Sequence, residues 1–91
     1  MSAKAPEFLE GPEKLRAYYV RIAARSPQDP QWAHGIEVCD RWLSLQQRQD
    51  LTQADIDSVL QELRSQARPG SGWYIMRDQF TAWATEKGFV T

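Results

Sequence analysis

Apolar residues recur at helical intervals in four stretches of the chain. In the first stretch they fall at i, i+3, i+4 and i+7, as Leu15, Tyr18, Tyr19 and Ile22. Pro12 is a favoured first-turn residue, and Ser26 ends the stretch because a residue before proline avoids the helical region. We therefore predict a helix over residues 12–25, preceded by a flexible N-terminal arm over residues 1–11.

The second stretch has the widest apolar face. Its members cover nearly half of a helical cylinder: Trp32, Ile36, Val38, Cys39, Trp42, Leu43 and Leu45. Asp29 is placed to cap this helix, and Pro30 stands at its first position. Because so broad an apolar face touches more than one neighbour, we predict a central helix over residues 30–49.

The third and fourth helices are predicted over residues 53–67 and 75–87. Thr52 and Asp55 have the spacing of a capping box at the start of the third helix. Gly88 suits the left-handed residue that follows the fourth helix. The preceding run, 73–76, is either a brief extended segment or a first helical turn. The predicted fold is all-α: a compact bundle of about four helices, with residues 12–91 as a single helical domain.

Composition bounds the classes of function. The chain has 91 residues and a formal net charge of −1, so it lacks the global positive charge of a non-specific nucleic-acid or anionic-membrane binder. Cys39 is the only cysteine, which excludes an intramolecular disulfide and favours a reducing compartment. No apolar run is long enough for a signal peptide or a bilayer crossing. We expect a soluble, cytoplasmic protein with no membrane partner.

Reactive side chains are few. His34 is the only histidine, and it lies about 140° from Cys39 around an ideal helix, so the two do not form a pair on one face. With Glu37 it offers two metal ligands, fewer than a zinc site uses. The turn 70–72 is glycine-rich but lacks the Lys-Ser/Thr of a phosphate-binding loop. We predict no enzyme activity, no catalytic residue, no metal and no cofactor.

The near-neutral total conceals two segments of opposite charge. Residues 14–25 hold four bases and no acid, whereas residues 50–62 hold four acids and no base. Lys14, Arg21 and Arg25 fall within about 40° of one another on an ideal helix, beside Tyr18. This basic ridge (Lys14, Tyr18, Arg21 and Arg25) is a candidate surface for an acidic partner or for phosphate. Alternatively, the two segments pair within one chain or between two copies.

Aromatic residues next to arginine give a second candidate surface. Trp42 lies at the edge of its apolar stripe, and Trp73 and Tyr74 follow a glycine-rich turn, near Arg77. Trp, Tyr and Arg are the residue types enriched in interface hot spots. These four residues are candidates for binding a protein partner. We expect Trp42 and the pair Trp73 and Tyr74 to protrude, with a core position of Trp73 and Tyr74 as the alternative.

The leading hypothesis is a small non-enzymatic protein that binds another protein, as an adaptor, assembly factor or inhibitor. One alternative is a nucleic-acid-binding regulator in which the last two helices form a helix-turn-helix. Its recognition residues would be Arg77, Gln79, Thr81 and Thr85. A second alternative is a homodimeric structural protein held together by the two charged segments.

Overall fold

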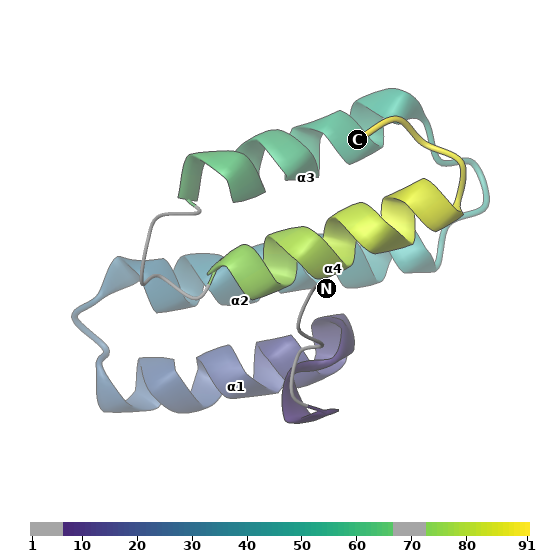
Figure 1. The fold of residues 1–91 in the computed structure, drawn as a ribbon. Helices are drawn as coiled ribbons and strands as arrows, with labels where there is room; N and C mark the ends of the chain where they lie inside the picture. The colour runs from purple at the N-terminus through teal and green to yellow at the C-terminus, as the bar shows by residue number, and fades with distance from the viewer. Residues whose placement is uncertain (1–6, 67–72) are drawn as a thin grey trace.

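The computed structural model describes residues 7–66 and 73–91, and these ranges form helices without any strand (Figure 1). The elements are the short 3-10 helix η1 (Glu7–Leu9) and four α-helices: α1 (Gly11–Arg25), α2 (Pro30–Gln46), α3 (Gln53–Gln66) and α4 (Trp73–Glu86). The predicted all-α bundle of four helices is confirmed. Two bounds differ by two residues or more: α2 ends at Gln46 rather than at Gln49, and α4 already begins at Trp73 rather than at residue 75. The start of α1 and the end of α4 each differ by one residue.

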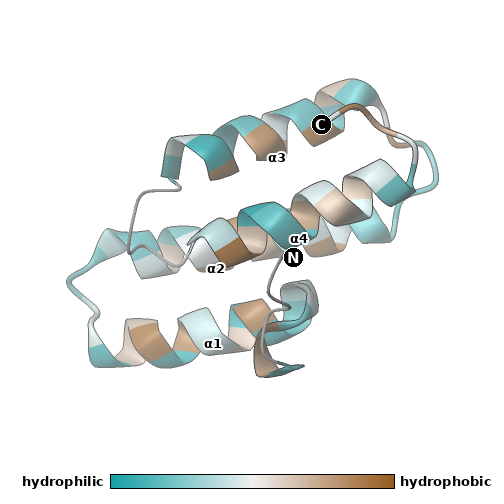
Figure 2. Ribbon diagram, in the orientation of Figure 1, coloured by the Kyte–Doolittle hydropathy of each residue, from teal (hydrophilic) through white to brown (hydrophobic). Residues whose placement is uncertain are grey.

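The helices α2 and α4 lie between α1 and α3, which therefore occupy opposite sides of the bundle (Figure 1). Hydrophobic and hydrophilic residues alternate along every helix, so each helix turns one face inward (Figure 2). The largest fully buried side chains come from all four helices: Leu15, Tyr19, Val38, Cys39, Ile56, Val59, Leu60, Leu63, Trp73, Met76 and Phe80. No helix of the described ranges has both the length and the apolar character needed to cross a bilayer.

A glycine brings α1 and α2 close together. A Cβ atom added at Gly35 would come within 3.1 Å of the ring of Tyr19. The ring of Tyr19 is itself buried against Trp32 and Trp73, with ring centroids 5.9 and 6.2 Å away. The face of α1 that carries Tyr19 therefore lies against α2, and the opposite face is directed outward.

The backbone of residues 9–11 is bonded to α4 through the side chain of Gln79. The amide of Gln79 accepts from the Gly11 N–H at 2.6 Å and donates to the Leu9 carbonyl at 2.7 Å. The side chain of Leu9 is buried in the core. Of the flexible arm predicted over residues 1–11, residues 1–6 lie outside the described ranges, whereas residues 7–11 are packed against the bundle.

The end of the chain is held in a similar way. Gly88 has a φ of 93°, and the Phe89 N–H donates to the Ala84 carbonyl at 3.0 Å, as the predicted glycine cap requires. The amide of Gln53 then donates to the Val90 carbonyl at 2.8 Å and accepts from the Val90 N–H at 3.0 Å. The tail therefore runs back along α3.

Candidate functional site

The outward face of α1 carries the basic ridge. Lys14, Arg21 and Arg25 are exposed, while Tyr18 is half-buried and packs against the core. Within residues 7–66 and 73–91, none of these three bases makes an ion pair or a side-chain hydrogen bond. Arg16, on another face of the same helix, instead bonds to Asp40 of α2 at 2.6 Å. The ridge is therefore the part of the basic segment that is left for solvent or a partner.

A groove runs between η1 and this face of α1. It has a volume of about 560 Å³ and is lined by Glu7, Phe8, Lys14, Ala17 and Arg21. The side chain of Phe8 remains 56% exposed, with its ring centroid 6.4 Å from that of Tyr18. The groove thus places an apolar aromatic wall beside two bases, a combination typical of surfaces that bind another molecule.

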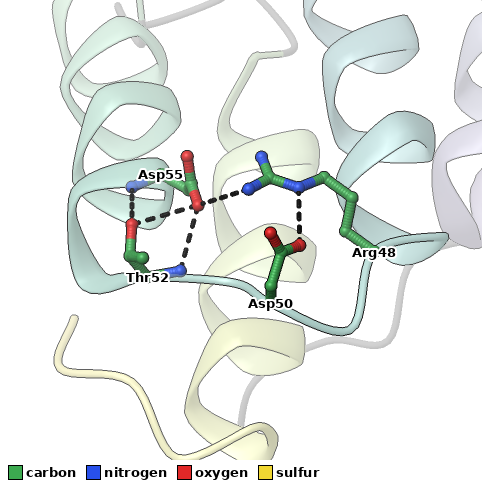
Figure 3. Close-up of polar contacts among 4 residues, drawn as sticks. All are labelled: Arg48, Asp50, Thr52 and Asp55. Carbon is green, nitrogen blue, oxygen red and sulfur yellow. Dashed lines mark hydrogen bonds and ion pairs between the residues drawn. The ribbon is translucent and has the colours of Figure 1, made fainter.

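The acids of segment 50–62 bond to other residues of the same chain, as Figure 3 shows for Asp50 and Asp55. The Asp55 carboxylate accepts from the Thr52 N–H at 3.0 Å, and the Asp55 N–H donates to the Thr52 hydroxyl at 3.3 Å, which confirms the predicted capping box. The Arg48 guanidinium lies 3.3 Å from the Asp55 carboxylate and 3.2 Å from that of Asp50. The hydrogen bonds from Thr52 hold the pKa of Asp55 below its usual range, and the bond from Arg48 does the same for the pKa of Asp50.

The remaining acids of this segment also have partners. Asp57 accepts from the Gln53 amide at 2.9 Å, and Glu62 pairs with His34 across the α2–α3 contact. No ion pair among the described residues joins segment 50–62 to segment 14–25, because α2 and α4 separate α3 from α1. Pairing of the two segments within one chain is therefore excluded for the described residues.

Two of the predicted binding residues are in the core. Trp42 and Trp73 are 2% and 1% exposed, so the expectation that Trp42 protrudes is wrong, and of the two alternatives for Trp73 the core position is the observed one. Trp42 packs edge-on against Phe80, with ring centroids 5.4 Å apart and an interplanar angle of 83°. Trp73 begins α4 itself, which points its ring inward between Tyr19 and His34.

The other residues of the second candidate surface are only partly accessible. Tyr74 and Arg77 are half-buried, and the Arg77 guanidinium lies 4.6 Å from the centre of the Tyr74 ring. Arg77 also bonds to Asp78 at 3.0 Å. Gln79, predicted to read a base in the helix-turn-helix alternative, instead holds η1, and the turn that would join the two helices lies outside the described residues.

The two most reactive side chains, those of His34 and Cys39, are packed against other residues of the bundle. His34 is partly buried: it pairs with Glu62, and its ring centroid is 5.3 Å from that of Trp73. Cys39 is fully buried, and its Sγ is 3.7 Å from the Met76 Sδ. Burial raises the pKa of the Cys39 thiol to about 12, so the thiol stays protonated at neutral pH. No cluster of three metal-ligating side chains occurs in the part of the chain that the structure describes.

Two residues of the groove escaped prediction from the sequence. Phe8 falls in the predicted arm, and Ala17 lies off the apolar stripe that predicts the buried face of this helix. The signal that the sequence offers is an aromatic residue, Phe8, shortly before a helix rich in bases. The glycine-rich turn 70–72 lies outside the described residues.

No protein-family model, curated protein or solved structure matches this chain.

Proposed function

We propose that this is a small non-enzymatic binding protein, of the adaptor, assembly-factor or inhibitor type, that docks an acidic segment of another protein on the outer face of α1. The observation that carries the proposal is the set of three exposed bases on the basic ridge, which have no ion-pair partner among the described residues. Two of them, Lys14 and Arg21, line a groove together with the half-exposed ring of Phe8. Long-range attraction from such a surface speeds and orients the approach of an acidic partner.

An acidic protein segment fits this surface better than nucleic acid does. The three bases extend over about 16 Å of helix, and the chain as a whole has a net charge of −1. Phosphate-dominated binding draws its affinity from many bases that each neutralise a phosphate, and this ridge has only three. The aromatic wall of Phe8 adds the apolar contact that a protein partner offers.

The homodimer alternative has less support. A second copy would have to offer acids to the ridge, but those of segment 50–62 already bond to Arg48, His34 and Gln53. Exchanging these contacts for ion pairs of the same kind between two copies would add little free energy of association.

The test compares three immobilised proteins: the wild type, Arg21→Glu and the control Lys87→Glu. The control makes the same change of charge at an exposed lysine beyond the end of α4. Proteins from host lysate are identified by mass spectrometry, and the same eluate is stained for nucleic acid. Each retained protein is then purified and titrated against all three variants.

We expect a partner with an acidic segment that binds the wild type and the control equally and binds Arg21→Glu at least about tenfold more weakly. Micromolar binding of duplex DNA, lost between about 50 and 200 mM salt, would instead favour the nucleic-acid alternative. Equal capture by all three proteins would refute the assignment to α1.

A further inference from the structure

We infer that the element docked on α1 is an amphipathic α-helix of the partner, lying along α1 with carboxylates bordering its apolar stripe. This inference rests on the proposed function, which requires only an acidic segment of any conformation.

The outer face of α1 presents two parallel rows. Ala17, Val20 and Ala24 are all exposed and fall within about 60° of one another on an ideal helix. Their centre lies about 90° from that of Lys14, Arg21 and Arg25, so the apolar row runs directly beside the basic one. Val20 is 41% exposed, which makes it, with Phe8, one of the large apolar side chains that the described bundle leaves uncovered.

Rows of this kind match the surface of another helix. Residues at i, i+3 or i+4 and i+7 of a partner helix form ridges that pack between the ridges of α1. The stretch from Lys14 to Arg25 rises about 16 Å, the length of three helical turns. A helix of that length therefore covers both rows at once, with its apolar stripe on Val20 and its carboxylates toward the bases.

An extended peptide gains less from this surface. Strand addition requires an exposed sheet edge, and the described residues include no strand. A proline-rich peptide requires a groove lined by several rings, whereas here Phe8 pairs with a Tyr18 that is half-buried.

The charges also set where the carboxylates of the partner lie. Glu7 lines the groove at the η1 end, and Arg21 and Arg25 lie toward the other end of α1. A helix with its acids opposite Arg21 and Arg25, and an apolar residue opposite Phe8, matches the surface along its whole length.

The experiment is a display selection with random peptides of about 16 residues, long enough for four helical turns. Binders are selected on the full chain and counter-selected on the double variant Lys14→Glu/Arg21→Glu. Circular dichroism and thermal unfolding check that this variant keeps its fold. Each enriched peptide is titrated against the wild type, the double variant and Lys87→Glu, and again with proline at its central position.

We expect enriched peptides with acids spaced at i, i+3 or i+4 and i+7 beside an apolar stripe. They should gain helicity on binding, and the central proline and the double variant should each weaken binding at least about tenfold. Acidic or proline-rich peptides that lack helical spacing and tolerate the proline would overturn the helical partner and leave the proposed function standing. If no enriched peptide depends on Lys14 and Arg21, both the inference and the proposed function fail.

Discussion

The outer face of α1 and the start of α3 carry opposite charges of similar density, but their side chains have different surroundings. At α3 the carboxylates cap the helix, bond to Arg48 or pair with His34. On α1 the basic ridge lies beside an open groove and bonds to nothing among the described residues. The two charged segments therefore differ in their contacts: the acids of segment 50–62 bond within the fold, whereas Lys14, Arg21 and Arg25 make no ion pair among the described residues. We expect substitutions to separate a role in stability from a role in binding.

The largest effect on stability is expected where aromatic packing joins the helices. Trp73→Ala removes a ring that is 1% exposed and lies against Tyr19 and His34, so it should lower the free energy of unfolding by about 3–5 kcal/mol. Chemical denaturation measures this change. The control is Tyr74→Ala, whose half-buried side chain should cost much less. Equal losses for the two variants would place Trp73 outside the core.

A smaller loss of stability is expected at the cap of α3. Thr52→Ala removes the hydroxyl that accepts from the Asp55 N–H, which should cost about 1 kcal/mol. The same variant should bind any partner of α1 as the wild type does, because α2 and α4 lie between the two sites. Denaturation and titration of one protein sample check both statements. Weakened binding without unfolding would break the separation of roles.

Acidification should weaken the same cap. Because the pKa of Asp55 is lowered in the folded protein, its carboxylate stabilises the fold above the unfolded pKa of about 4, and this contribution disappears as the pH falls through the lowered value. The wild type should therefore exceed Asp55→Asn in stability at pH 7, and the difference should shrink toward pH 3. Denaturant unfolding at several pH values measures it. A difference that does not change with pH would show that the charge of Asp55 is not what matters.

The smallest effect on stability is expected on α1. Arg21 is exposed and unpaired among the described residues, so Arg21→Glu should change the free energy of unfolding by less than about 0.5 kcal/mol. If Arg21→Glu keeps its stability but binds the partner more weakly, then Arg21 acts in binding and not in folding. A loss of more than about 1 kcal/mol would indicate that Arg21 has a structural role in the bundle.

Local signals in the sequence predicted most of the fold. The Thr52 and Asp55 pair, the Asp29 cap and the glycine at 88 each act within a few residues, and the structure has all three. Contacts between distant residues were not predictable in this way. The burial of Trp73 depends on where α4 begins, and the position of Phe8 depends on a bond between residues 68 apart in sequence. The basic ridge was predicted because helical spacing alone brings it together, whereas its groove also needs η1.

The hydrogen bonds of Gln79 have a consequence for how the molecule is made. Gln79 fixes Leu9 and Gly11, and so holds η1, which carries Phe8 as one wall of the groove. During synthesis α1 emerges long before α4, so the growing chain shows its basic ridge before the bonds of Gln79 form. Before α4 packs, only contacts with α1, such as that between Phe8 and Tyr18, support this wall, and the two bonds of Gln79 add the second support once α4 is in place. A wall held from two helices keeps the shape of the groove tied to the folding of the whole bundle.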